Sequence, residues 1–232
     1  MTTLDIFPYK KCIIGLLSKH SGKEIFDKFV EKVKAYYERP VNTMEDLKKR
    51  ENKISIGTMW EMVCADWLRV SGKYEAVWTL QEWREYIEVA NLPVGYNLKK
   101  KDVGIDLIAK SKKYGYHAIQ CKWRKKGTIT WAMVSTFAGL CSKTGPWSSQ
   151  VIMTNASGIG RNVPRTKSDY NMCAGTFRGT SREHWMKMCD IYDEHLLEDP
   201  DVNKIEQKVD VEAMRKARLE RFSIASSSTD TS

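Results

Sequence analysis

The chain has 232 residues, 42% of them hydrophobic, which is long enough for one domain with a substantial core and some additions. Its formal net charge of +9 and pI of about 9.2 favour a polyanionic partner, most simply nucleic acid, although solubility alone explains many basic proteins. The absence of a long apolar run and of CxxC or zinc-spaced cysteine patterns predicts no membrane span, no zinc site and no disulfide framework. We therefore expect a reduced, intracellular protein, cytoplasmic or nuclear and not secreted.

The N-terminal part, residues 1–53, is predicted to be a helical addition to the core. Apolar residues recur at helical spacing over 23–39, after Ser21 and before Pro40. A second, short helix is predicted over 43–50, with a capping-box-like start. We expect the aromatic residues of this part to serve packing.

The next predicted helix, 56–70, carries the first candidate site residue. Its apolar stripe is predicted at Met59, Met62, Val63, Trp67 and Val70. Glu61 lies near the edge of that stripe, where most helical glutamates are simply solvated. A further helix is predicted over 78–89, and the long stretch 74–98 is either an insertion or a decorated edge of the fold.

Residues 102–126 predict a β-hairpin, with strands at 103–109 and 116–122 and a polar turn closed by glycine. If the hairpin is symmetric about Lys113, Asp106 lies opposite Gln120. Lys122 shares the face of Gln120 because side chains alternate along a strand. A carboxylate, an amide oxygen and an ammonium group then converge on one spot, unless the register slips or the acid and lysine form a simple cross-strand ion pair.

The remaining elements are predicted from the same patterns. A helix is expected over 130–143, a buried strand over 150–154, a Gly-rich loop over 155–165, an edge strand over 171–176, and a helix from 180 or 181 to 195. The core stripe of the last helix is predicted at Trp185, Met188, Cys189 and Tyr192. His117, His184 and His195 are expected to be structural. Residues 199–232 are predicted to be a charged helix and a disordered tail.

Basic and aromatic side chains flank the hairpin and form the predicted nucleic-acid-binding set. They are Lys99, Lys100 and Lys101 before the hairpin, Trp123, Arg124, Lys125 and Lys126 after it, and Arg161 and Arg165 in the Gly-rich loop. Cationic groups pair with phosphates, and an indole ring stacks on bases. Solvated surface loops are the alternative for the basic positions.

The sequence of the hairpin resembles that of the Mrr-like restriction endonucleases, a branch of the PD-(D/E)XK nuclease superfamily. It is carried by GIDLIA at 104–109, with Asp106, and by Gln120-Cys121-Lys122 on the next strand. Trp60-Glu61 also matches the aromatic–acid pair of the family's first core helix. The resemblance covers roughly 54–165 and implies an α/β fold: a restriction-endonuclease-like α-β-β-α-β core over 54–198, with a mixed sheet flanked by helices, and helical additions at both ends.

The same resemblance implies a metal-dependent nuclease that hydrolyses phosphodiester bonds in DNA. Asp106, Gln120 and Glu61 are then the catalytic ligands of Mg²⁺ or Mn²⁺, ions that prefer oxygen donors, and Lys122 assists the attacking water. DNA is the expected partner; a homodimer, or an associated helicase or methyltransferase, is left open. The alternative function is a catalytically inactive nucleic-acid-binding module of nuclease-like fold.

Overall fold

The computed structural model describes residues 7–40, 42–44, 54–98, 104–164 and 169–192, all within one compact unit. The second unit, 193–232, lies outside the described residues, and so do Lys99, Lys100, Lys101, Arg165 and His195. Most of the helix predicted over 43–50 and the charged segment 199–232 are outside them as well. The predictions for these residues remain predictions.

Two helices form the N-terminal part, α1 (Tyr9–Leu17) and α2 (Gly22–Tyr37). The second confirms the helix predicted from apolar spacing, and the first was not predicted. The ring of Phe26 in α2 stacks on Phe177 at 5.1 Å between centroids. Since Phe177 belongs to α7 (Ala174–Arg178), the N-terminal helices pack in the same unit as the C-terminal ones.

Helix α4 (Ile56–Val70) has the bounds that the sequence predicts, but a different buried face. Met59 and Val63 are buried as expected, whereas Met62 is 37% exposed and Trp67 and Val70 are only half-buried. The rest of the buried stripe consists of Trp60, Cys64, Ala65 and Leu68. The helix is apolar nearly all round, so its pattern alone did not determine which side faces the core.

A five-stranded mixed sheet forms the centre of the unit, in the order β1-β2-β3-β4-β5. Its strands are β1 (Ala76–Thr79), β2 (Leu107–Ser111), β3 (Gly115–Lys122), β4 (Ser149–Thr154) and β5 (Tyr170–Met172). The pairs β1–β2 and β2–β3 are antiparallel, and β3–β4 and β4–β5 are parallel. This mixed α/β arrangement confirms the predicted restriction-endonuclease-like fold class.

The stretch 74–98 adds an edge strand to the predicted α-β-β-α-β core. The helix predicted from residue 78 starts too early, because Trp78 and Thr79 belong to β1 and α5 runs over Leu80–Ala90. The boundary is a capping box: the Thr79 hydroxyl accepts the Glu82 N–H at 3.3 Å, and the Glu82 carboxylate accepts the Thr79 N–H at 2.8 Å. The short helix η1 (Val94–Tyr96) follows.

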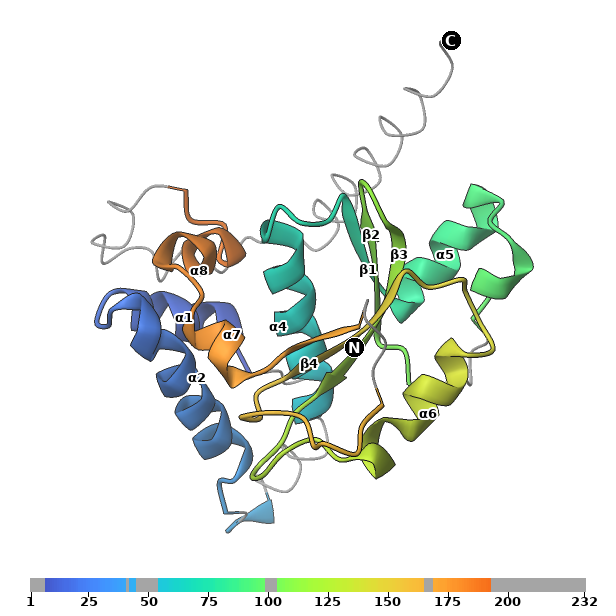
Figure 1. Ribbon diagram of the computed structural model, residues 1–232. Coiled ribbons are helices and arrows are strands. Elements are labelled where there is room, and N and C mark those ends of the chain that lie inside the picture. The colour runs from blue at the N-terminus through green and yellow to red at the C-terminus, as the bar shows by residue number, and fades with distance from the viewer. Residues whose placement is uncertain (1–6, 41, 45–53, 99–103, 165–168, 193–232) are drawn as a thin grey trace. The chain divides into compact units, whose positions relative to one another are not determined.

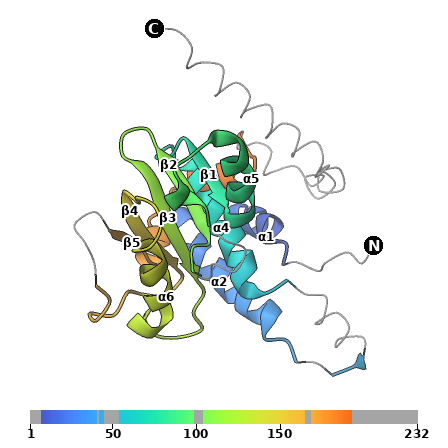
Figure 2. The same ribbon diagram turned by 90° about the vertical axis from the view of Figure 1, so that its right-hand side faces the viewer.

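Helices cover both faces of the sheet (Figure 1). Helix α4 lies on one side with α1, α2, α7 and α8 (Arg182–Met188), and α5 and α6 (Trp131–Cys141) lie on the other. Figure 2 shows the strands in sequence from β1, beside α5, to β4 and β5 beyond β3. On the α6 side the core joins Ile108, Ala118 and Ile152 of the sheet to Trp83 and Phe137.

The C-terminal described elements are shorter than predicted. The edge strand expected over 171–176 is replaced by β5 and α7, and α8 ends at Met188, well before residue 195. Tyr192, which was predicted in the core, is 79% exposed because it lies beyond the end of that helix. All six cysteines are free thiols. The described helices are all too short or too polar to cross a lipid bilayer.

Candidate active site

The hairpin has the register that the sequence predicts. Leu107 pairs with Ile119 and Ile108 with Ala118, so the centre of the turn is Lys113. Continuing the register by one residue places Asp106 opposite Gln120. The first strand begins at Leu107 and not at 103, which leaves Asp106 immediately before it.

The Asp106 carboxylate extends the β2–β3 ladder beyond the last paired residue. Its Oδ2 atom accepts the backbone N–H of Cys121 at 2.7 Å. The backbone of Asp106 is held on both sides, because its N–H donates to the Ile119 carbonyl at 2.9 Å and its carbonyl accepts the Leu80 N–H at 3.1 Å. The carboxylate is therefore fixed at the end of the strands.

Gly104 allows the backbone just before Asp106 to pack closely against α6. Its φ of +138° lies in the region that favours glycine, and a Cβ atom there would stand 3.0 Å from the Phe137 Cα atom. A side chain at this position would force α6 away from the sheet. The glycine of the GIDLIA stretch thus positions the carboxylate two residues later.

Glu61 and Asp106 form an electrostatically coupled pair with Lys122. Burial is the main cause that raises the pKa of Glu61 to about 7; the negative charge of Asp106 also raises it, and Lys122 lowers it. Burial raises the pKa of Asp106 to about 6, against the lowering effects of the Cys121 N–H and of Lys122. The structure therefore brings Glu61 of α4, Asp106 and Lys122 into one another's electric fields.

Gln120 supplies an oxygen without a partner. Its side chain is 2% exposed, and its Oε1 atom is buried without a hydrogen bond to any described residue. Gln120 pairs with Ile152, and Lys122 pairs with Thr154 at the end of β3. A buried acceptor left unsatisfied costs about 1–3 kcal/mol, so the site holds a polar atom that is unused within the described chain.

Gln120 and Lys122 share one face of β3, as strand parity predicts, and Cys121 points to the other. The Cys121 thiol lies close to the thiol of Cys64 in α4. Glu61 lies one helical turn from Cys64, on the same side of α4. Glu61 therefore lies within the electrostatic influence of Asp106 and Lys122 at the end of the strands.

The donor set fits a divalent cation that prefers oxygen ligands. No group of three or more His, Cys, Asp or Glu side chains is placed to hold a metal within the described part of the chain. Glu61 and Asp106 provide two carboxylates, and the amide oxygen of Gln120 is a third, neutral donor. A cation bound by the two carboxylates would lower both raised carboxyl pKa values.

The predicted nucleic-acid-binding residues occupy different environments. The ring of Trp123 packs edge-on against Trp60 at 5.4 Å, and Lys125 forms an ion pair with Glu38 at 3.2 Å. Lys126 and Arg161 are exposed. These placements leave the predicted contacts with nucleic acid untested.

Asn155 is a residue that the sequence analysis missed. Its Oδ1 atom accepts the Arg124 N–H at 2.6 Å, and its Nδ2 atom donates to the Arg124 carbonyl at 2.8 Å. These two bonds hold the chain just after Lys122. An asparagine directly after a strand is a weak signal for such a bracket, and its partner could not be identified from sequence.

His117 and His184 are held by hydrogen bonds to other described residues. The two ring nitrogens of His117 lie 2.6 Å from the Ser149 hydroxyl and 3.0 Å from the Ser111 hydroxyl. His184 hydrogen-bonds to the Trp67 carbonyl at 3.0 Å. Neither ring belongs to the coupled group of Glu61 and its partners.

A family model described as a restriction endonuclease, of the Mrr catalytic type, matches residues 69–175. The match includes Asp106, Gln120 and Lys122, and it also includes the stretch 74–98. Glu61 lies just outside it. No curated protein matches the chain.

Proposed function

Over residues 69–175 the chain belongs to the Mrr-like family of restriction endonucleases, and from this premise we propose that it is a metal-dependent endonuclease hydrolysing phosphodiester bonds in DNA. One observation carries the proposal. Glu61, Asp106 and Lys122 act on one another at the end of β2 and β3, where the carboxyl pKa values are raised to about 7 and about 6. Perturbed carboxyl groups of this kind are typical of functional sites.

Asp106, Glu61 and Gln120 are the residues proposed to hold Mg²⁺ or Mn²⁺. A bound ion of this type supplies activation of water and neutralisation of the charge that develops on phosphate. Asp106 contributes the main negative charge and Gln120 contributes a neutral oxygen. Because an amide replaces a carboxylate at 120, metal binding depends more strongly on Asp106 and Glu61.

Lys122 is proposed to act on the reacting groups. Its ammonium group orients the attacking water or stabilises the negative charge around the pentavalent phosphorus, or its neutral amine accepts a proton from that water. The products are then a 5′-phosphate and a 3′-hydroxyl. Lys99, Lys100, Lys101, Arg124, Lys125, Lys126 and the loop arginines Arg161 and Arg165 are proposed to contact backbone phosphates, and Trp123 to contribute an aromatic ring beside them.

Incubation of the full chain with plasmid and single-stranded DNA tests this function. We expect cleavage in Mg²⁺ or Mn²⁺ and none in EDTA, with Asp106→Asn inactive in all three. Equal cleavage by the wild type and the Asp106→Asn variant would mean that a contaminant or another site is responsible.

A second candidate is a domain that binds nucleic acid without cutting it. It is favoured by the donor set, since Glu61 and Asp106 are the only two carboxylates placed at the described site and the third donor is a neutral amide. DNA binding that decreases with salt, without cleavage in either metal, would select this candidate.

A further inference from the structure

The positive charge of the chain is concentrated in one segment. No Asp or Glu occurs among the 62 residues between Asp106 and Asp169, and 11 Lys and Arg do. All the other residues together carry 27 Lys and Arg against 29 Asp and Glu. The net charge of +9 therefore arises entirely from the segment that contains β2, β3, α6 and β4, and not from general surface charge.

Two loops of this segment are joined at the end of the sheet where Lys122 lies. They are residues 123–130, after β3, and 155–164, after β4. The Ile129 N–H donates to the Gly158 carbonyl at 3.1 Å, and the Gly160 N–H donates to the Ile129 carbonyl at 2.7 Å. A Cβ atom on Gly160 would stand 3.1 Å from that same carbonyl, so the loops touch through their backbones.

We refer to these two joined loops, with the adjacent first turn of α6, as the platform. The bracket of Asn155 around the backbone of Arg124 adds two further hydrogen bonds between its loops. The exposed side chains of Lys126 and Arg161 come from the two different loops. The platform therefore presents cations from both loops on a backbone that is held in place.

Trp131 provides an aromatic ring on the platform. It is the first residue of α6, and at 37% exposure it is the one exposed tryptophan of the eight, all of which lie in the described residues. It lines a small hollow together with Val163 and Pro164. Within the described residues its ring makes no aromatic contact and its indole N–H no hydrogen bond. The exposed part of this residue is thus available to a ligand.

Building on the proposed nuclease function, we propose that the platform binds an unpaired stretch of a DNA strand. A nucleobase stacks on Trp131, and phosphates contact Lys126 and Arg161. In a duplex the faces of each base are covered by its neighbours, so a free indole can stack only on a base that is unpaired or at an end. The inferred substrate is DNA with a single-stranded segment beside the bond that is cut.

Binding in EDTA tests this inference without any cleavage. Fluorescence anisotropy would compare three labelled DNAs of one sequence: a single strand, a blunt duplex and a duplex with a single-stranded tail. Trp131→Ala should weaken binding of the single strand and the tailed duplex about 5- to 100-fold, the range expected for one stacked base, with little change for the blunt duplex. Trp131→Phe should retain most of the affinity.

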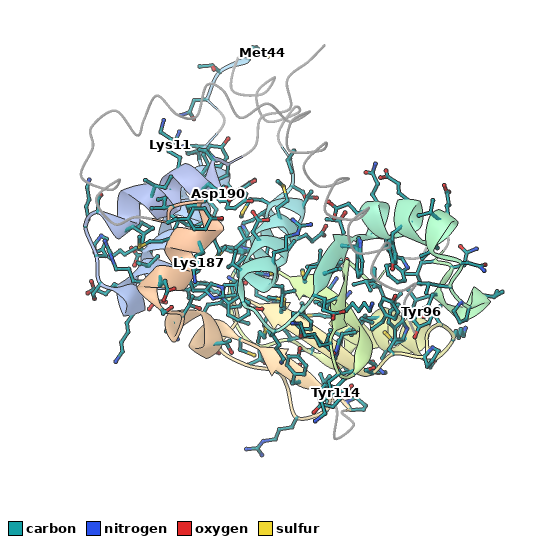
Figure 3. All side chains as sticks on the ribbon, turned by 90° about the horizontal axis from the view of Figure 1, so that it is seen from above. Lys11, Met44, Tyr96, Tyr114, Lys187 and Asp190 are labelled. Atoms are coloured by element: carbon teal, nitrogen blue, oxygen red, sulfur yellow. The ribbon has the colours of Figure 1, made fainter. Side chains whose placement is uncertain are left out.

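Tyr114→Ala is the matched control. Tyr114, labelled in Figure 3, is 63% exposed and belongs to the same acid-free segment. It lies in the hairpin turn, at the opposite end of β3 from Lys122. Its removal should leave all three affinities unchanged. Arg161→Ala, on an exposed loop position, should reduce the log–log salt slope for the single strand by about 0.7.

The outcomes separate this inference from the proposed function. Loss of affinity in Trp131→Ala that is equal for the three DNAs, or no loss together with an unchanged slope in Arg161→Ala, would overturn the platform. Metal-dependent cleavage combined with that result would leave the nuclease in place. Conversely, selective binding through Trp131 without cleavage in any metal would support the platform and reject the nuclease.

Discussion

The carboxylate of Asp106 accepts the backbone N–H of Cys121 at 2.7 Å, so a side chain takes the place of a backbone carbonyl at the end of the β2–β3 ladder. The same carboxylate acts on Glu61 and is acted on by Lys122. Asp106 therefore has two roles, a structural one as the acceptor of the Cys121 N–H and an electrostatic one toward Glu61 and Lys122. Experiments at this position must separate them.

Asp106→Asn and Asp106→Ala separate these two roles. The asparagine retains an oxygen that can accept the Cys121 N–H but loses the negative charge, so we expect cleavage to fall below detection while the melting temperature is maintained. The alanine variant should also be inactive, and less stable by about 1–3 kcal/mol, because it leaves a backbone N–H without its acceptor. Cleavage assays in Mg²⁺ and chemical denaturation measure the two effects. Cleavage by the asparagine variant at the wild-type rate would exclude Asp106 from the chemistry.

The hairpin shows how far the sequence can predict this site. The turn centred on Lys113 predicts the register, and strand alternation predicts that Gln120 and Lys122 share a face. The hydrogen bond from Cys121 to Asp106 was not predictable, because it arises where β2 departs from regular pairing. The sequence predicts Asp106 as a site residue alone, and the structure adds its role in the backbone.

Tertiary contacts account for what the sequence could not predict. The face of α4 is selected by Trp60, whose ring contacts those of Phe177 and Trp123 and whose N–H donates to the Met153 carbonyl at 3.3 Å. The helical spacing of Tyr9, Ile13 and Leu17 is a local signal for α1. The platform depends on backbone bonds between loops about 30 residues apart, which no local pattern encodes.

The raised pKa values predict an unusual dependence of stability on pH. Glu61 and Asp106 have pKa values of about 7 and about 6, above the ordinary 4.5 and 3.8, so the folded state retains protons that the unfolded state has released. The free energy of unfolding should then decrease as pH rises from about 4 to about 7. Glu61→Gln removes one ionisable group, so this variant should melt above the wild type at pH 8 and close to it at pH 4.

Glu88→Gln, on the exposed side of α5, is the control for that experiment and should show little difference from the wild type at either pH. A Glu61→Gln variant that loses stability at pH 8 would show that the charged form of Glu61 is favoured in the fold, in conflict with its raised pKa. Addition of Mn²⁺ at pH 8 should raise the melting temperature of the wild type and not that of Asp106→Asn, since a ligand of the folded state alone stabilises it.

Lys122 and Lys126 should differ in the parameter that each controls. Lys122→Ala is expected to lower the single-turnover cleavage rate by at least ~10²-fold at saturating DNA, with affinity nearly unchanged, because its ammonium group acts on the reacting centre. Lys126→Ala should weaken DNA binding and leave that rate intact. Rate measurements at saturating DNA, combined with binding in EDTA, distinguish them. A Lys122→Ala variant that binds poorly but cuts normally would reassign Lys122 to phosphate contact.

The buried amide of Gln120 gives a prediction in which metal binding and stability move separately. Gln120→Leu removes an oxygen that has no hydrogen-bond partner among the described residues, so the fold should lose little stability while cleavage at low Mg²⁺ falls. Gln120→Glu places a third carboxylate beside two whose pKa values are already raised, so it should lower the melting temperature in EDTA. With metal present the same variant should bind Mn²⁺ at least as tightly as the wild type, because it restores a charged oxygen ligand. Calorimetric titration with Mn²⁺ and melting with and without metal give both readouts. Full cleavage by Gln120→Leu at low Mg²⁺ would show that Gln120 does not act as a ligand.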